Sequence, residues 1–296
     1  MSDVANVRNL TKEFGSVKAL DRVDLTVEKG EVHGFIGPNG AGKTTTIRCM
    51  LGILKPTKGH VKVFGLDAWD DSVEILKRVA FVPGDVNLWD NLTGGEVIDL
   101  FLALHGTTDT VRRDELIERF DLDPSKKCGT YSKGNRQKVA LVAALASDGD
   151  FYILDEPTSG LDPLMGSVFK SYILELKREG KTVLLSSHIL SEVEELCDVI
   201  SIIRGGRIIE TGNLAEMRHF KRTRVHVETA RPIEGLETLE GVHDLTSEQN
   251  SYEFHADNDA LGVLISHIDK FGITNLISAP PSLEELFMTH YEEVGD

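Results

Sequence analysis

The glycine-rich run FIGPNGAGKTTT, residues 35–46, is the feature that most constrains how this chain folds. It contains the pattern G-x-x-x-x-G-K-T between a segment that predicts a strand (residues 32–36) and one that predicts a helix (residues 45–54). Strand, glycine loop and helix in this order direct backbone N–H groups and the positive end of a helix dipole at one point. The run therefore predicts a phosphate-binding loop within an α/β fold, with a nucleoside triphosphate as its ligand.

The residues of this phosphate-binding loop have separate expected roles. The glycines let the backbone approach the β- and γ-phosphates, Lys43 adds a positive charge, and Thr44 offers a hydroxyl to Mg²⁺. The residues expected to contact the nucleotide are Gly37, Pro38, Asn39, Gly40, Ala41, Gly42, Lys43, Thr44 and Thr45.

Composition limits the ligands and the surroundings of the chain. Its 296 residues carry a net charge of −16. Nucleic acid is therefore not expected as the main ligand, because binding it requires Lys and Arg to neutralise phosphates. No apolar run approaches the ~18 residues that span a bilayer, and the N-terminus lacks the character of a signal peptide. Three widely spaced cysteines predict neither a disulfide framework nor a zinc site, so we expect a cytoplasmic protein whose membrane part, if any, is another polypeptide.

The pattern of apolar residues predicts two domains. Short strands are predicted in the first third, at residues 24–27, 32–36, 60–64 and 79–82. Helices are predicted at about residues 86–147, and strands again at residues 151–154 and 182–186. The run VISIIRGGRIIETG predicts a hairpin around Gly205 and Gly206. We expect an α/β P-loop domain over residues 1–220 with a helical insertion, and a small, acidic α+β domain over residues 221–296.

Two consecutive carboxylates suit phosphate chemistry. The apolar segment at residues 151–154 predicts a buried strand, and Asp155 and Glu156 follow it directly. A carboxylate at such a strand end is the expected partner of Thr44 on Mg²⁺, and a neighbouring carboxylate is placed to activate water for attack on the γ-phosphate. We interpret Asp155 as a metal ligand and Glu156 as the general base.

With these residues in place, the chain resembles the ATP-binding subunit of an ABC transporter over residues 3–220. The most specific match is the run YSKGNRQ, residues 131–137, immediately before a predicted helix. The family has L-S-G-G-Q here, and this signature loop contacts the γ-phosphate of ATP held by the other subunit. Ser132 and Gly134 match the family, whereas Lys133 replaces a glycine and Asn135 replaces the glutamine.

Three further positions agree with the resemblance. His188 follows a predicted strand where the family places a histidine near the γ-phosphate. Phe14 matches the aromatic position that stacks on adenine, although a core role would also suit it. The run TSGLD, residues 158–162, is similar to the loop through which the two subunits contact each other's sites.

One position departs from the family. Its glutamine, which contacts Mg²⁺ or water, is replaced here by Gly84, which has no side chain. Asp85 follows directly and offers carboxylate oxygens. Either Asp85 acts as the substitute metal ligand, or this contact is missing.

The resemblance implies a mechanism and partners. Mg·ATP would bind at the interface of a head-to-tail homodimer, with Lys43, Glu156 and His188 as catalytic residues. The helical insertion would contact a polytopic membrane permease, so the chain would lie on the cytoplasmic face of the cell membrane. The run PPSLEELF, residues 280–287, is similar to the C-terminal domain of drug, antibiotic or polysaccharide exporter ATPases, which favours an exporter.

Two other classes of protein remain open from the sequence. A soluble ABC-type ATPase acting on a ribosome or a nucleic-acid complex would share the nucleotide residues. Such proteins usually join two ATPase halves or carry long coiled coils, whereas this chain has one phosphate-binding loop and no sustained heptads. A simple phosphate-loop kinase or GTPase would not need residues 132–135, and the chain has no N-K-x-D motif for guanine.

Overall fold

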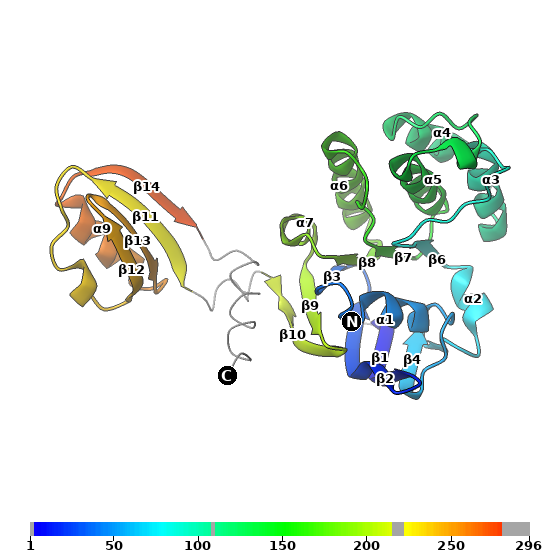
Figure 1. Cartoon of the computed structure of the whole chain (residues 1–296), viewed down its shortest axis with the longest axis horizontal. Helices are drawn as coiled ribbons and strands as arrows, with labels where there is room; N and C mark the ends of the chain where they lie inside the picture. The colour runs from blue at the N-terminus through cyan, green and yellow to red at the C-terminus, as the bar shows by residue number, and fades with distance from the viewer. Residues whose placement is uncertain (1–2, 108–109, 215–221, 280–296) are drawn as a thin grey trace. The chain divides into compact units, whose positions relative to one another are not determined.

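The computed structural model describes residues 3–107, 110–214 and 222–279 (Figure 1). The chain forms two compact units, Met1–Gly212 and Asn213–Asp296, and each has its own hydrophobic core. The PPSLEELF run at residues 280–287 lies outside the described residues.

A six-stranded sheet forms the centre of the first unit and positions the site. Its order is β10-β9-β3-β8-β7-β6, and the pairings from β9 through to β6 are parallel. Gly205 and Gly206 join β9 to β10, both with positive φ, which confirms the predicted hairpin. The strands are β3 (Val32–Ile36), β6 (Val79–Val82), β7 (Phe151–Asp155), β8 (Thr182–Ser187), β9 (Val199–Arg204) and β10 (Arg207–Asn213).

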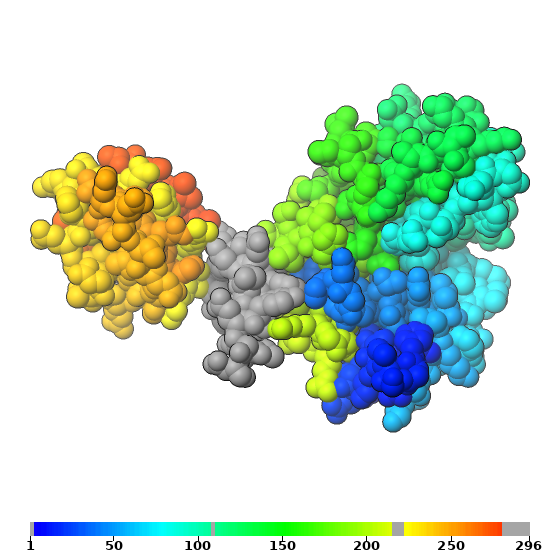
Figure 2. Space-filling view, in the orientation of Figure 1, coloured from blue at the N-terminus to red at the C-terminus, as the bar shows by residue number. Residues whose placement is uncertain are grey.

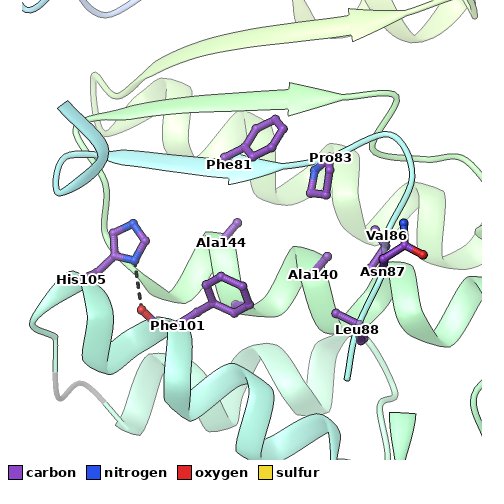
Figure 3. A pocket seen from close by; sticks show the side chains of 10 residues that line it. Phe81, Pro83, Val86, Asn87, Leu88, Phe101, His105, Ala140 and Ala144 are labelled. Atoms are coloured by element: carbon purple, nitrogen blue, oxygen red, sulfur yellow. Dashed lines mark hydrogen bonds between the residues drawn. The ribbon is translucent and has the colours of Figure 1, made fainter. Parts of the chain in front are cut away.

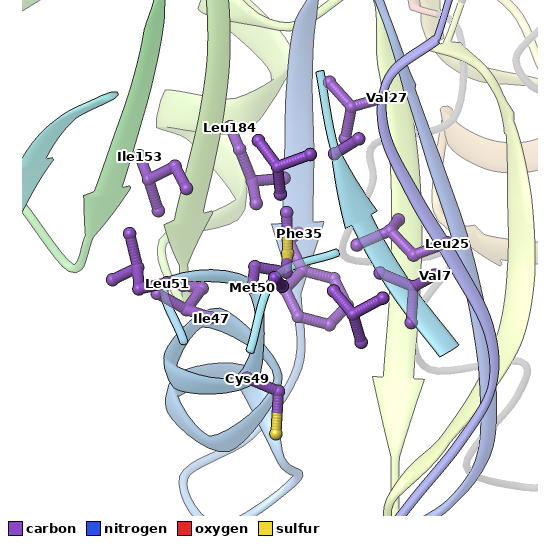
Figure 4. Packing of buried hydrophobic residues seen from close by; sticks show 14 of the residues in the cluster. Val7, Leu25, Val27, Phe35, Ile47, Cys49, Met50, Leu51, Ile153 and Leu184 are labelled. Atoms are coloured by element: carbon purple, nitrogen blue, oxygen red, sulfur yellow. The ribbon is translucent and has the colours of Figure 1, made fainter. Parts of the chain in front are cut away.

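A second sheet is antiparallel and has the order β2-β1-β4-β5. Helix α1 (Lys43–Met50) packs in a hydrophobic core shared with both sheets, which includes Val7, Leu25, Phe35, Ile47 and Met50 (Figure 4). This packing fixes the position of α1, the helix that follows the phosphate-binding loop. The strands are β1 (Asp3–Phe14), β2 (Val17–Glu28), β4 (Lys58–Val63) and β5 (Leu66–Asp67).

The antiparallel sheet is longer than its sequence predicts. The sequence pattern does not indicate β1, and the strand predicted at residues 24–27 is only the end of β2. The register between β1 and β2 shifts between Val7 and Leu10, and Asn9 has a φ of 49°. Such a shift moves side chains to the other face of the sheet, so the alternation of apolar and polar residues is lost from the sequence.

Helices occupy the insertion between β6 and β7, as predicted. Thr93 and Glu96 form the capping box that starts α3, and the Thr93 hydrogen bonds hold the pKa of the Glu96 carboxyl below its usual value. No helix in the described residues combines the length and apolar character needed to cross a membrane. The insertion contains α3 (Gly94–His105), α4 (Thr110–Arg119), η1 (Cys128–Thr130) and α5 (Lys133–Ala146). The other helices of this unit are α2 (Ser72–Leu76), α6 (Pro163–Arg178) and α7 (Leu190–Leu196).

The second unit is a small α+β fold, visible as a closely packed body coloured yellow to orange in Figure 2. Its antiparallel sheet has the order β12-β13-β11-β14. Helix α9 (Leu261–Asp269) contributes the buried Leu264 and Ile268 to a core with Val227 and Phe254 of the sheet. The remaining elements are β11 (Thr223–Thr229), η2 (Leu236–Thr238), β12 (Val242–Glu248), β13 (Ser251–Ala256) and β14 (Ile273–Ala279).

Candidate functional site

Three neighbouring strands bring the predicted site residues to one edge of the central sheet. β3, β8 and β7 are adjacent and parallel, and Asp155 pairs with Ser186 in the register of β7 and β8. The phosphate-binding loop follows β3, Glu156 follows β7 and His188 follows β8. The site therefore lies beyond the carboxyl ends of parallel strands, where open α/β sheets bind their ligands.

Glycines stand at the crowded positions of the phosphate-binding loop. A Cβ on Gly37 would lie 2.3 Å from the carbonyl oxygen of Ile203 in β9, and Gly42 has a φ of 117°. Gly37 and Ala41 are buried beneath the loop. The pocket above it is lined by Ala19, Pro38, Asn39, Gly40, Gly42, Lys43, Thr44, Thr45 and Glu156.

The Lys43 ammonium is buried and has three oxygen partners, of which Pro38 O, at 3.5 Å, is the most distant. Its Nζ donates a hydrogen bond to Gly37 O at 2.6 Å and lies 3.1 Å from Glu156 Oε1. Only 6% of the lysine side chain is exposed, so these partners offset the cost of removing its charge from water. Lys43 and Glu156 are therefore coupled: a phosphate that engages the ammonium competes with the carboxylate.

Asp155 and Thr44 form a pair of hard oxygen donors. The Thr44 hydroxyl donates to Asp155 Oδ2 at 2.8 Å, and the Ser186 hydroxyl donates to Oδ1 of the same carboxylate at 2.5 Å. Asp155 is 1% exposed, and Ser186 fixes its orientation. Mg²⁺ binds through one or two protein oxygens plus water and substrate phosphates, so this hydroxyl and carboxylate fit it.

Glu156 is held in an uncommon backbone conformation. Its φ is 49°, in the left-handed region, and its N–H donates to Ser186 O at 3.1 Å. Its Oε2 lies 2.6 Å from Nδ1 of His188, which has a largely exposed side chain. Residues in sparsely populated backbone regions concentrate at functional sites. Glu156 thus contacts Lys43 through one carboxylate oxygen and His188 through the other.

The signature loop begins α5 but lies apart from the phosphate-binding loop. Ser132 is the N-cap of α5 and accepts a hydrogen bond from the Asn135 N–H at 3.3 Å. Lys133 Nζ donates to Ser159 Oγ at 3.2 Å. Neither Ser132 nor Gly134 lines the two pockets beside the phosphate-binding loop. Within the described residues, one chain does not bring its signature loop to its own nucleotide pocket.

Gly134 is needed for the packing of α5 on the neighbouring loop, which gives a prediction. A Cβ at this position would lie 2.6 Å from the carbonyl oxygen of Gly160. Gly134→Ala is therefore expected to destabilise the first unit by about 1–3 kcal/mol in chemical denaturation, because backbone must shift. Gly166→Ala in α6 is the control, since a Cβ at Gly166 would have no neighbour within 4 Å and alanine favours a helix. Equal stability of the two variants would contradict this account.

Phe14 lies away from the lining of the nucleotide pocket. It ends β1 with 49% of its surface exposed, and the Lys12 ammonium lies 5.0 Å from the centre of its ring. Ala19 of β2 lines the pocket instead. The exposure of Phe14 argues against a core role, and its contact with adenine stays a prediction.

Asp85 lies at the edge of a second pocket, beside the pair formed by Thr44 and Asp155. That pocket is also lined by Thr44, Asp155 and Glu156. The Asp85 carboxylate is exposed and accepts a hydrogen bond from Asn87 Nδ2 at 3.3 Å. A Cβ on Gly84 would lie 3.4 Å from Asp155 Oδ2, so the residue without a side chain is the one that adjoins the Asp155 carboxylate.

Two polar residues that support the site are absent from the sequence predictions. Ser186 orients Asp155, and the buried Gln137 donates from Nε2 to Pro157 O at 2.8 Å, which ties α5 to the segment after β7. Ser186 has a sequence signal, because two serines at the end of an apolar strand directly before His188 are unusual in a buried position. Gln137 ends the run at residues 131–137, but nothing in that run indicates this contact, since its partner is a backbone atom distant in sequence.

Comparisons with known proteins agree on one family. The profile described as "ABC transporter" matches residues 20–159, and "ATP-binding protein DrrA1-3-like, C-terminal domain" matches residues 212–291. ABC transporter ATP-binding protein NatA of Bacillus subtilis is 40% identical over 213 residues, 70% of this chain and 87% of NatA. Bacitracin transport ATP-binding protein BcrA of Bacillus licheniformis is 32% identical over 296 residues, 99% of this chain and 95% of BcrA. A solved dimeric ATP-binding cassette bound to ADP and Pi has a TM-score of 0.65 and 27% identity, covering 71% of this chain and 98% of that one.

Proposed function

This chain belongs to the ABC transporter ATP-binding family and is an ATP-binding, ATP-hydrolysing subunit, and on that premise we propose that two copies of it bind Mg·ATP between them and power a separate membrane permease. The main support for a dimer is that, within one chain, the signature loop is separate from the nucleotide pocket. Ser132 and Gly134 lie outside the pocket of their own phosphate-binding loop. A head-to-tail partner would supply them, and the related cassette bound to ADP and Pi is a dimer.

The residues at the strand ends support a division of labour in hydrolysis. Lys43 and the loop amides would hold the phosphates, while Thr44 and Asp155 would hold Mg²⁺, which supplies charge neutralisation on the β- and γ-phosphates. Glu156 would accept the proton of the attacking water. His188, which contacts Glu156 Oε2, would orient that carboxylate and interact with the γ-phosphoryl group.

An apolar groove in the first unit supports the permease contact. It lies between the end of β6 and the helical insertion, where Phe81 and Pro83 face Phe101 of α3 and Ala140 and Ala144 of α5 (Figure 3). Trp89 is half-exposed, with its ring centre 6.5 Å from that of Phe101. Grooves of this kind bind amphipathic helices, and a short helix from a permease loop is the occupant that we propose. The chain would then work on the cytoplasmic face of the membrane.

The proposed cargo class is an antibiotic or a similar compound exported from the cell. The support is the match to BcrA over nearly the whole chain, including the second unit, which the DrrA1-3-like description also covers. The class therefore rests on the relatives' names, and the residues of the nucleotide site carry no information about cargo.

Capture of the chain from detergent-extracted native membranes tests the partner. Affinity purification followed by mass spectrometry is expected to recover a polytopic membrane protein in near-equal amount. Recovery only from the soluble fraction, with ribosomes, nucleic acid or no partner, would contradict the proposal and favour a soluble ABC-type ATPase.

Asp85→Ala tests whether this residue replaces the family's glutamine. We expect it to lower permease-stimulated ATP hydrolysis several-fold and to leave ATP affinity within about twofold. The reason is that Asp85 lines a pocket with Thr44 and Asp155 but does not line the pocket above the phosphate-binding loop. Asn87→Ala is the matched control, since it removes the hydrogen-bond partner of Asp85 and keeps the carboxylate. Equal losses in hydrolysis and affinity would count against a metal or water contact.

A further inference from the structure

A buried glutamate behind the catalytic residues joins the two segments that carry them. Glu192 lies in the first turn of α7 and is 7% exposed. Its Oε2 accepts a hydrogen bond from Thr158 Oγ1 at 3.0 Å and a second, from Ser187 Oγ, at 3.4 Å. The Ser187 hydroxyl oxygen also accepts from the Ile189 N–H at 2.9 Å. The carboxylate therefore has hydroxyl partners on both sides of the site.

The positions of these hydroxyls make the arrangement relevant to catalysis. Thr158 comes two residues after Glu156, and Ser187 comes directly before His188. Glu156 and His188 contact each other at 2.6 Å, but the His188 side chain is 54% exposed and its backbone leaves β8 at this point. An exposed imidazole at the end of a strand has rotational freedom that a catalytic contact cannot tolerate.

We propose that Glu192 is a positioning residue that holds the Glu156–His188 pair in register by hydrogen-bonding the segments on either side of it. The inference rests on the proposed catalytic roles of Glu156 and His188. Glu192 does not line the nucleotide pocket, and its side-chain partners are Thr158 and Ser187 rather than Thr44 or Asp155. It would therefore act through Thr158 and Ser187.

The loop that contains Thr158 also contacts the signature loop. Beyond Thr158, Ser159 accepts from Lys133, and Gly160 O is the atom against which Gly134 packs. The loop at residues 156–160 thus contacts Glu192 on one side and the start of α5 on the other. A shift of the signature loop on a partner's nucleotide would be transmitted through this loop to Glu156.

A structural role for Glu192 predicts a different outcome. α7 has no side-chain hydrogen bond at its N-cap, and a carboxylate in the first turn stabilises a helix through its dipole. If that were its whole function, removing Glu192 would lower stability, and removing the Thr158 hydroxyl would have no effect on turnover.

The experiment compares Thr158→Val, which removes the hydroxyl, with Thr158→Ser, which keeps it. Thr158→Val is expected to lower kcat by about 10-fold to 100-fold, the loss expected for a misplacement near 1 Å, with KM for ATP within about threefold of the parent. Thr158→Ser is expected to restore most of the activity. Glu192→Ala is expected to lower kcat at least as much as Thr158→Val, since it also removes the hydrogen bond from Ser187. The double variant is expected to be no slower than Glu192→Ala alone, because both single variants remove the hydrogen bond between Thr158 and Glu192.

Glu195→Ala is the control, since Glu195 lies on the same helix and pairs with Lys170 at the surface. Thermal unfolding of every variant identifies any that fails to fold. Native kcat in Thr158→Val, or additive losses in the double variant, would overturn the inference. Glu156→Gln, assayed in parallel, separates a failure of the Glu192 role from a failure of the proposed catalytic roles. If Glu156→Gln is inactive and Thr158→Val has native kcat, only the Glu192 role is contradicted. If Glu156→Gln is active, the proposed role of Glu156 as general base is contradicted.

Discussion

Glu156→Gln is expected to bind ATP and to lose ATP hydrolysis by a factor of at least about 100, because an amide cannot accept the proton of the attacking water. Its ATP affinity is expected to stay the same or to rise. Lys43 Nζ lies 3.1 Å from Glu156 Oε1, and an amide oxygen would compete with the phosphates for this ammonium less strongly than a carboxylate does. Phosphate release measures the first effect, and calorimetric titration with ATP measures the second.

The same variant also tests the composite site. Since ATP would remain uncleaved between two chains, size-exclusion chromatography with Mg·ATP is expected to show a stable dimer. Glu74→Gln is the matched control, because Glu74 is an exposed residue of α2 paired only with Lys77 in the described residues. Near-native hydrolysis by Glu156→Gln would show that another group activates water, and a monomer with ATP bound would contradict the shared site.

The parts of the fold that were predicted are those where a local pattern and the tertiary structure agree. The strand at residues 32–36 is fully buried in a parallel sheet, so it is apolar throughout and the sequence indicates it directly. α3 begins with a capping box, and both of its residues, Thr93 and Glu96, are close together in the sequence. β1 fails for the opposite reason, because its register shift at Asn9 removes the period of two.

In the site, too, the sequence predicts side-chain contacts only where a local motif indicates them. Lys43, Thr44 and Asp155 could be predicted because their motifs fix both residue type and backbone context. In the structure Thr44 contacts Asp155, and Lys43 contacts Glu156. The hydrogen bond between Thr158 and Glu192 could not be predicted, since the two residues are 34 positions apart in the sequence. Contacts that depend on strand order become visible only when β8 is placed between β3 and β7.

Lys43→Met is expected to weaken ATP binding by on the order of 100-fold, which corresponds to about 3 kcal/mol for charged hydrogen bonds to phosphate. Methionine keeps much of the length and the apolar stem but removes the ammonium that lies between Gly37 O and Glu156 Oε1. Glu156→Gln, in contrast, is expected to lose no ATP affinity. In turnover the loss for Lys43→Met should approach that for Glu156→Gln, because unbound phosphates cannot be positioned.

The interpretation of Lys43→Met depends on whether the change is local. Removing a buried ammonium also leaves the Glu156 carboxylate with His188 as its remaining ionic partner in the described residues, so stability must be measured alongside binding. Lys77→Met, which removes an exposed lysine directly after α2, is the matched control and is expected to bind ATP normally. If Lys43→Met bound ATP as tightly as Lys77→Met, the ammonium would serve only to neutralise Glu156, and the loop amides would have to hold the phosphates alone.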